Sequence, residues 1–244
     1  MTAPDAIGPE SLERGAVHVW RVPLDDARAA GSLRPVLNDE ERARADRFFR
    51  DEHRTRFVIA HGWKRRILAR YVGAPEAALR FVCGPHGKPA IVGQERDGLH
   101  FNLSHSGDLA LVAVARGGEV GVDVERWDAE VEHLELAERF FSPAERDALR
   151  ALAGDPEAVV AGFFAAWSRK EAYLKATGHG ITRGLHHFDV TLAPGVAPAL
   201  LADRLDQAAT ARGTLRGVDV GAGYSAALVA RAPLREVVVL GAGG

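Results

Sequence analysis

The sequence predicts an α+β fold made of two similar halves related by pseudo-twofold symmetry. The first observation is the order of the elements: each half opens with a strand pattern, continues with helix patterns and closes with further strand patterns. This order favours an α+β architecture over a doubly wound parallel sheet. The second observation is an internal repeat. Four pairs of segments recur in the same order: 46–54 and 138–146, 62–68 and 166–172, 108–116 and 225–231, and 17–22 and 120–127.

The chain of 244 residues is long enough for two such halves. The glycine pair at 117–118 is the natural joint, so the expected units are an N-terminal half, 1–117, and a C-terminal half, 118–244. Acidic side chains are concentrated in the second copy, where Glu171 stands opposite Ile67. A duplicated fold with this asymmetry predicts a single active site at the interface between the halves.

In the first half, the alternating sequence "VHVWRV" predicts a strand over 16–22. Asn38 is a suitable helix N-cap and Gly73 a suitable helix stop, and two helices are expected between them, over 38–50 and 54–72. Strands then follow at about 79–83, 89–92, 99–103 and 109–115.

In the second half, "VGVDVERW" predicts a strand over 119–125. Ser142-Pro143 is a helix start and Gly178 a helix stop. Helices are expected over 130–139, 143–153 and 157–177, and strands over 186–192, 214–220, 224–231 and 235–240. The intervening segment 193–213, rich in Ala, Pro and Gly, is expected to be a loop or a short helix.

Composition excludes several classes of protein. A net charge of -2 gives no overall attraction to nucleic acid or to an anionic membrane, so anion binding requires local clusters. The single cysteine, Cys83, cannot form an internal disulfide, which fits a reducing compartment. The first twenty residues lack a secretory pattern, and runs such as "LALVAVA" are too short to span a bilayer. We therefore expect a cytoplasmic protein without nucleic-acid or membrane partners.

Asp123 and Glu125 are two residues apart on an expected strand, so both side chains point to the same face. Two carboxylates at this spacing repel each other unless a cation or a basic group lies between them. The simpler interpretation is a solvated sheet face, which is common for an isolated Asp-x-Glu.

Glu171 and Lys175 are spaced i, i+4 on the expected long helix. One interpretation is a surface ion pair, with Trp167 packed in the core. The other makes Glu171 a third oxygen ligand of a divalent metal beside Asp123 and Glu125, since Mg²⁺ prefers carboxylate, phosphate and water oxygens. Lys175, one turn further on, would then neutralise a phosphate that the metal also holds.

Two further segments carry polar groups. In "FNLSHSGD", Ser104 and His105 lie where a strand gives way to a turn. Adjacent Ser and His cannot act as a nucleophile and base, so two interpretations remain: His105 donates a hydrogen bond to a phosphate, or Ser104 simply caps the turn. In "CGPHGKPAIV", Lys88 precedes a strand, either near a ligand or in an ordinary hairpin loop.

Taken together, four separated motifs resemble the 4'-phosphopantetheinyl transferase family, in its larger Sfp-type branch whose single chain is a pseudo-dimer. The motifs are Gly87-Lys88-Pro89, then "FNLSHS" at 101–106, "GVDVE" at 121–125, and "WSRKEAYLK" at 167–175 followed by Gly178-x-Gly180. The resemblance implies transfer of the 4'-phosphopantetheine arm of coenzyme A to a serine of an acyl or peptidyl carrier protein. It also implies a requirement for Mg²⁺ and release of adenosine 3',5'-bisphosphate.

The resemblance assigns roles to individual residues. Asp123, Glu125 and Glu171 would hold the metal, Glu171 would also be the base for the incoming serine, and Lys175 would support the diphosphate. Contacts with coenzyme A are implied for Arg44, Arg54, Lys88, Ser104, His105 and Lys175.

Several points stay open at this level. Arg42 and Arg47 compete with Arg44 for the 3'-phosphate, and Glu145 is either an acid near the metal or a helix N-terminal carboxylate. A helical carrier is expected to dock near 128–150, and fatty acid, polyketide, nonribosomal peptide or siderophore pathways, including secondary metabolite biosynthesis, could supply it. A fused pair of halves favours a monomer. The alternatives are a Mg²⁺-dependent phosphoesterase of coenzyme A or a nucleotide, and a non-enzymatic coenzyme A- or carrier-binding module.

Overall fold

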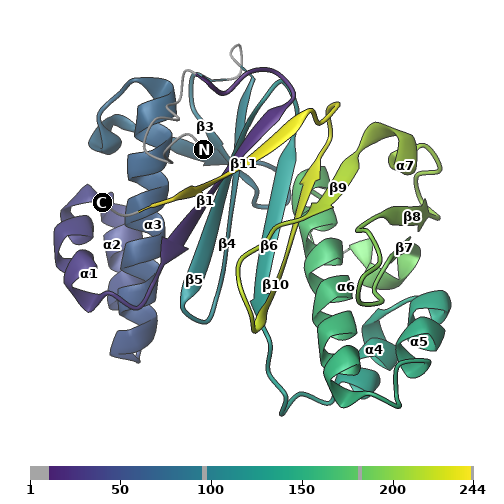
Figure 1. Cartoon of the computed structure of the whole chain (residues 1–244). Coiled ribbons are helices and arrows are strands. Elements are labelled where there is room, and N and C mark those ends of the chain that lie inside the picture. The colour runs from purple at the N-terminus through teal and green to yellow at the C-terminus, as the bar shows by residue number, and fades with distance from the viewer. Residues whose placement is uncertain (1–10, 95–97, 181–182, 243–244) are drawn as a thin grey trace, which may run out of the picture.

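The protein contains two main β-sheets that meet along one edge of each (Figure 1). The computed structural model describes residues 11–94, 98–180 and 183–242. The first sheet has the order β11-β1-β5-β4, with bounds Glu236–Gly241, Ala16–Pro23, Leu109–Arg116 and Leu99–Ser106. The second has the order β6-β10-β9, with bounds Val120–Arg126, Tyr224–Ala230 and Thr214–Gly217. All neighbours in these sheets are antiparallel except β1 and β11.

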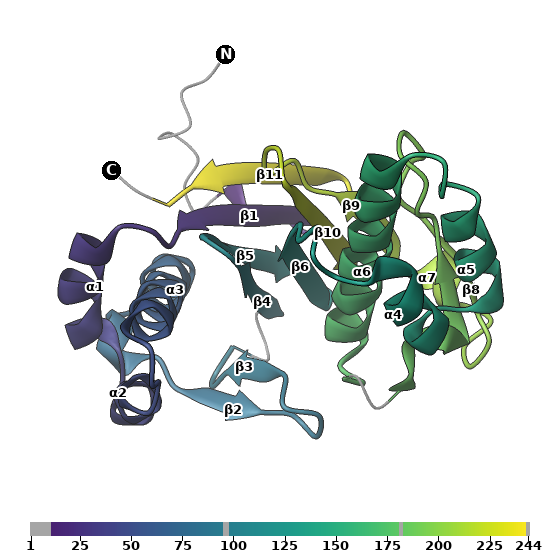
Figure 2. The same cartoon turned by 90° about the horizontal axis from the view of Figure 1, so that it is seen from below.

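The helices lie on opposite sides of the paired sheets, as Figure 2 shows. The first half contributes α1 (Ala27–Leu33), α2 (Asp39–Asp46) and α3 (Asp51–Val72). The second contributes α4 (His133–Phe140), α5 (Pro143–Arg150), α6 (Pro156–Thr177) and α7 (Ala209–Arg212). Two small hairpins complete the fold: β2 with β3 (Phe81–Cys83 and Pro89–Ile91) and β7 with β8 (Phe188–Val190 and Leu200–Asp203). Short 3₁₀ turns within the described ranges include η3 (Arg34–Val36), η4 (Glu76–Ala78) and η6 (Leu185–His187).

The helix ends follow the chemistry expected from the sequence. Asn38 and Ser142 each begin a helix with a full capping box, in which the glutamate three residues later bonds back to the cap. Gly73 and Gly178 end α3 and α6 in the left-handed conformation, with φ of 68° and 70°. The α+β prediction and these starts and stops are confirmed. Helix α1 was not predicted, and the segment 193–213 contains β8 as well as α7.

The internal repeat is real, but two of its predicted matches are wrong in detail. The strand matches hold, because β5 lies between β1 and β4 as β10 lies between β6 and β9. Helices α3 and α6 each have 22 residues and end at equivalent glycines. End-to-end alignment therefore places Arg66, rather than Ile67, opposite Glu171. The match of 46–54 with 138–146 is coincidental, because the first spans α2 to α3 and the second α4 to α5.

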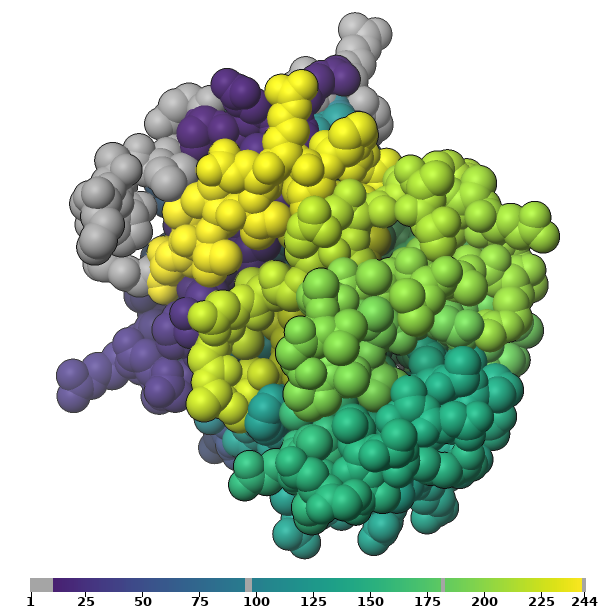
Figure 3. All heavy atoms as spheres, turned by 45° about the vertical axis from the view of Figure 1, so that its right-hand side comes forward, coloured from purple at the N-terminus to yellow at the C-terminus, as the bar shows by residue number. Residues whose placement is uncertain are grey.

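The last strand crosses between the halves. β11 pairs in parallel with β1, from Ala16 opposite Glu236 to Arg21 opposite Gly241, and Figure 3 shows this yellow segment against the purple one. A shared apolar core joins the sheets as well, through Val19 and Leu111 of the first and Val122 and Leu228 of the second. Strand pairing and the apolar core both cross the boundary between 1–117 and 118–244, so the division of the chain into these two halves stays a prediction.

Two further expectations concern membranes and export. In the described ranges, no helix has both the length and the apolar character needed to cross a membrane. Residues 1–10, on which the expectation of no secretory signal partly depends, lie outside the described residues.

A buried ion pair ties the long helix α6 to α5 and to the segment around β7. The Lys170 ammonium donates to Glu145 Oε2 (2.7 Å) and to the carbonyls of Leu185 (2.9 Å) and Phe188 (2.6 Å). Glu145 Oε1 in turn accepts the Val190 N–H at 2.8 Å. The exposed fractions of the two side chains are 0% and 3%. Glu145 is therefore the buried partner of Lys170 as well as a carboxylate at the N-terminus of α5.

Replacing Lys170 with methionine should destabilise the protein strongly. The substitution preserves most of the volume but leaves the Glu145 carboxylate buried without its cation, which typically costs about 3–5 kcal/mol. The free energy of unfolding from urea titration measures this loss. The matched control is Arg150→Met on α5, whose side chain is 53% exposed and pairs with Glu138 and Asp147. We expect it to cost at most about 1 kcal/mol. Equal effects of the two variants would contradict the anchoring role of Lys170.

Candidate active site

The site is assembled where α6 presses directly on β6. A Cβ atom placed on Gly121 would lie 2.2 Å from the Ala172 carbonyl oxygen and 2.3 Å from the Ala176 nitrogen. No larger residue fits between this strand and this helix, which is why "GVDVE" begins with glycine. Asp123 lies two residues further along β6, and Glu171 and Lys175 lie on α6 on either side of the contact. The close approach therefore brings these three groups together.

Asp123 is the most buried of the candidate acids, with 2% of its surface exposed. Its Oδ1 accepts hydrogen bonds from the Lys175 ammonium (2.6 Å) and the Ser104 hydroxyl (2.7 Å). Its Oδ2 is buried and has no hydrogen-bond partner. Burial raises the pKa of Asp123 above its ordinary value, while Lys175 and Ser104 oppose that rise. The free oxygen points to a missing positive or hydrogen-bonding group.

Glu125 and Glu171 share the electrostatic environment of Asp123. Burial, followed by the neighbouring Asp123 carboxylate, raises the pKa of Glu125 to about 7, against a hydrogen bond from the Ser106 hydroxyl at 2.9 Å. Burial and the same aspartate raise the pKa of Glu171. The charge of Glu171 also raises the pKa of Glu125. Each carboxylate therefore affects another, as groups of one site do.

The three carboxylates fit a hard divalent cation in chemistry. They offer only oxygen atoms, one of them orphaned, and Mg²⁺ takes oxygen ligands of this type. Among the residues that the structure describes, no three His, Cys, Asp or Glu side chains are gathered into a ready metal-binding cluster. Lys175 supplies the positive charge on Asp123 instead. The assignment of Asp123, Glu125 and Glu171 as metal ligands stays a prediction that the donor set supports.

Cationic groups of the first half face the site near His105. The side chain of His105 reaches solvent, but partial burial and the positive charges of Lys175, Arg44 and Arg56 lower its pKa. Among the candidate arginines, Arg44 therefore acts electrostatically on His105. Arg56 was not predicted from the sequence, and it pairs with Glu52 and Asp108.

Other predicted ligand-binding residues have partners within the chain. Arg54 bonds Asp51 Oδ1 (2.7 Å) and the Phe48 carbonyl (3.1 Å). The Arg42 guanidinium bonds Asp39 and the Leu37 carbonyl.

Lys88 and Ser104 are likewise engaged. Lys88 pairs with Glu119 and donates to the Val120 carbonyl at 2.9 Å, which fastens the β2–β3 hairpin to the second half. Ser104 is 6% exposed, and its hydroxyl contacts Asp123 and Lys175. Their contacts with coenzyme A stay predictions.

Three adjoining cavities surround this hairpin at the seam, which is the boundary between the two halves where β4 lies beside β6. One, of about 190 Å³, is lined by Glu171 and Lys175 together with Asn102, Lys88 and His86 among others. A second, of about 440 Å³, shares His86, Lys88, Pro89 and Gly178 with it. A third, of about 770 Å³, extends along α2 past Arg44 and shares Gly87 and Pro89 with the first.

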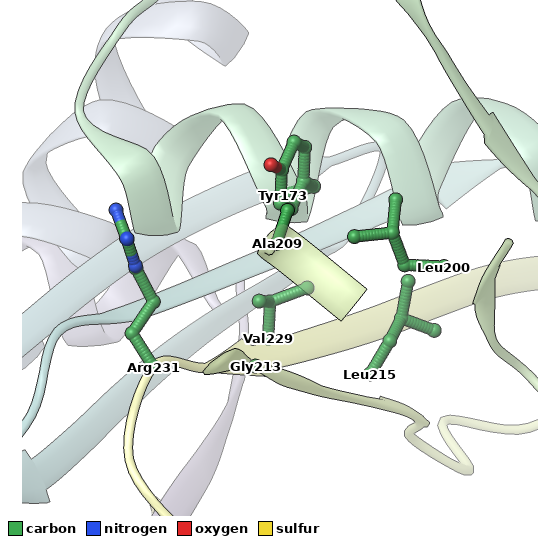
Figure 4. Close-up of a pocket in the computed structure, with 7 residues that line it drawn as sticks. All are labelled: Tyr173, Leu200, Ala209, Gly213, Leu215, Val229 and Arg231. Atoms are coloured by element: carbon green, nitrogen blue, oxygen red, sulfur yellow. The ribbon is translucent and has the colours of Figure 1, made fainter. Parts of the chain in front are cut away.

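A separate pocket in the second half is too small to be the site (Figure 4). Its volume is about 10 Å³, and Tyr173, Leu200, Leu215 and Val229 supply most of an apolar wall. A hollow of this size holds at most about one water molecule. It lies away from the carboxylates, on the core side of α6.

Comparison with known proteins agrees with this geometry. Residues 119–229 match the family model described as the 4'-phosphopantetheinyl transferase superfamily. Residues 25–117 match the model described as 4'-phosphopantetheinyl transferase, N-terminal. The two matches meet at the glycine pair and together include every candidate residue.

Curated relatives carry the same name. The chain is 41% identical over 181 residues to 4'-phosphopantetheinyl transferase HetI of Nostoc sp., covering 73% of this chain and 75% of the relative. It is 38% identical over 176 residues to 4'-phosphopantetheinyl transferase psf-1 of Bacillus pumilus, covering 70% and 72%. It is 31% identical over 156 residues to 4'-phosphopantetheinyl transferase Sfp of Bacillus subtilis, covering 64% and 66%.

The crowding of carboxylates predicts that Glu125→Gln stabilises the metal-free protein at high pH. The pKa of Glu125 is about 7 in the folded protein, against the ordinary 4.5. Protonation of Glu125 therefore favours the folded state fully below pH 4.5, and this stabilisation is lost as the pH rises through about 7. Calorimetry in a chelator should show a Tm roughly 3 °C above wild type near pH 8 and no such difference near pH 4. The control, Glu236→Gln on exposed β11, should show no such pH-dependent change. If the wild type is as stable as Glu125→Gln near pH 8, the proposed repulsion between the carboxylates is refuted.

Proposed function

Since the chain belongs to the 4'-phosphopantetheinyl transferase superfamily, we propose that it transfers the phosphopantetheine arm of coenzyme A to a serine of an acyl or peptidyl carrier protein. Adenosine 3',5'-bisphosphate is the second product. The observation that carries the proposal is that Glu171 and Lys175 line one cavity at the seam, while the Lys175 ammonium lies 2.6 Å from Asp123 Oδ1.

The reaction exchanges one phosphorus–oxygen bond for another. The carrier serine oxygen bonds to the phosphorus that bears pantetheine, and the bond from this phosphorus to the bridging diphosphate oxygen breaks. The serine proton must go to a base, and Glu171 lines the cavity where the hydroxyl would enter. Burial and Asp123 raise the pKa of Glu171, which makes its carboxylate a better proton acceptor.

Asp123, Glu125 and Glu171 would hold Mg²⁺, the cofactor that we propose. When bound, the ion withdraws charge from phosphate oxygens and aligns them for displacement. The orphaned Asp123 Oδ2 and the raised pKa values of all three carboxylates support this assignment.

Lys175 holds positive charge at the place where negative charge would develop. Its ammonium lies 2.6 Å from Asp123 Oδ1 and 2.9 Å from Ser104 Oγ, and it lines the same cavity as Glu171. Its third N–H can bond a diphosphate oxygen while these contacts persist. Arg44 and His105 are proposed to bind the 3'-phosphate. Arg54 and Lys88 each keep N–H groups beyond the contacts described above, so both stay in the proposed set of coenzyme A contacts.

A carrier is proposed to dock over 128–150, and one chain is proposed to be sufficient for activity. A groove of about 430 Å³ between α4 and α6, lined by Val131, His133 and Val160 among others, supports this docking site. Leu134, in the same groove, is 39% exposed. The two halves of one chain already form the seam, so no partner subunit is required.

The test is incubation of the protein with coenzyme A, Mg²⁺ and a panel of apo carriers, read by carrier mass. A gain equal to the arm supports transfer, and chelation should abolish it. Consumption of coenzyme A without this gain would support a phosphoesterase instead. Binding of coenzyme A without turnover would support a binding module.

Asp123→Asn should lower the transfer rate by about 100-fold or more, because it removes a preorganised charge at the reacting phosphates. The amide is the same size as the carboxylate, so the circular dichroism spectrum should be unchanged. Near-normal transfer by this variant would remove Asp123 from the site.

Lys175→Ala should lower kcat more than it raises the Kd of coenzyme A, because its task lies in the transition state. Single-turnover kinetics and calorimetric titration separate the two quantities. The control is Arg212→Ala on α7, a side chain 52% exposed that pairs with Asp206. A pure binding defect in the lysine variant would contradict the proposed role.

A further inference from the structure

The edges of the two sheets are joined by side chains rather than by a backbone ladder. Strand β4 ends one sheet and β6 begins the other. Across this gap, Asn102 Oδ1, Ser104 Oγ and Ser106 Oγ accept the N–H groups of every second residue of β6. The acceptors pair in order with Val122 (2.9 Å), Val124 (3.4 Å) and Arg126 (3.1 Å). We call this row of three side chains the seam row.

Two members of the seam row make a second contact with a carboxylate. The Ser104 hydroxyl donates to Asp123 Oδ1 at 2.7 Å, and the Ser106 hydroxyl donates to Glu125 Oε2 at 2.9 Å. A hydroxyl can accept one hydrogen bond and donate another at once. Each serine therefore fixes the backbone of β6 and, through the same oxygen, the acid next to it.

We propose that Ser106 is a positioning residue of the transfer reaction, which orients the Glu125 carboxylate through the seam row. This inference depends on the proposed function of the site. The fixed β6 backbone and the fixed carboxylate oxygen leave Glu125 few orientations, although Asp123 repels it. Removing the hydroxyl frees the side chain to turn toward solvent. Groups that orient metal-ligating side chains typically contribute 10- to 100-fold in affinity or activity.

The key variant is Ser106→Ala, with Ser106→Thr as the conservative replacement. We expect Ser106→Ala to lower kcat by about 10-fold or more and to weaken divalent-ion binding similarly, with the KM for coenzyme A little changed. Ser106→Thr retains the hydroxyl and should restore most of both. Mn²⁺ titration followed by electron paramagnetic resonance, without coenzyme A, measures ion binding independently of turnover.

The matched control is Ser32→Ala in α1, whose hydroxyl donates to the Ala29 carbonyl within its own helix. It should leave kcat, Mn²⁺ affinity and Tm unchanged. If Ser106→Ala does not fold, Ser106→Cys serves instead, because it keeps the shape and donates only weakly.

The proposal is overturned if Ser106→Ala lowers Tm but leaves kcat and Mn²⁺ affinity at wild-type values, because the seam row would then only hold the sheets together. It is also overturned if Ser106→Thr fails to recover the loss. If wild type modifies no carrier, the proposed function fails, and the Mn²⁺ titration still decides whether Ser106 orients Glu125.

Discussion

The contact between Gly121 of β6 and the α6 backbone is the constraint on which the site depends. Strand and helix touch through main-chain atoms, with no side chain between them. Because main-chain atoms are in direct contact, the position of the helix fixes the position of the strand, and Lys175 can reach Asp123 at 2.6 Å. The seam row then fastens to β4 the edge of β6 that does not pair with β10. The strand that carries two carboxylates is thus fixed from both sides, which suits a reaction governed by positioning.

The two halves of the duplicated fold differ in the acidic side chains of their long helices. Each half has a capping-box glutamate that pairs with a buried base on its long helix: Glu41 with Lys64 and Arg65, and Glu145 with Lys170. When the helices are aligned end to end, Arg65 and Lys170 coincide, and both side chains are fully buried. The anchor is therefore common to both halves. At the next position the first half has Arg66 and the second has Glu171, so only the second adds acid at the seam.

Local chemistry could be predicted from the sequence, whereas partners across the fold could not. The caps at Asn38 and Ser142 and the shared face of Asp123 and Glu125 depend on neighbours along the chain. The missed features depend on distant segments. Ser106 was visible in an Asn-x-Ser-x-Ser alternation that places three acceptors on one strand face, but nothing local shows that β6 lies opposite. The pairing of β11 with β1 is hidden for the same reason.

The positions of the four lysines show which residue is found where distant segments of the chain meet. The chain has 31 basic residues, of which only four are lysine, and each ammonium gathers at least two groups. Lys64 meets Glu41 and His61, Lys88 meets Glu119 and a carbonyl, and Lys170 meets Glu145 and two carbonyls. Lys175 meets Asp123 and Ser104. A point charge with three rotatable donors satisfies acceptors that converge from different elements, which a planar guanidinium does less well. Lysine is kept where segments meet, and at Lys175 that meeting point is the site.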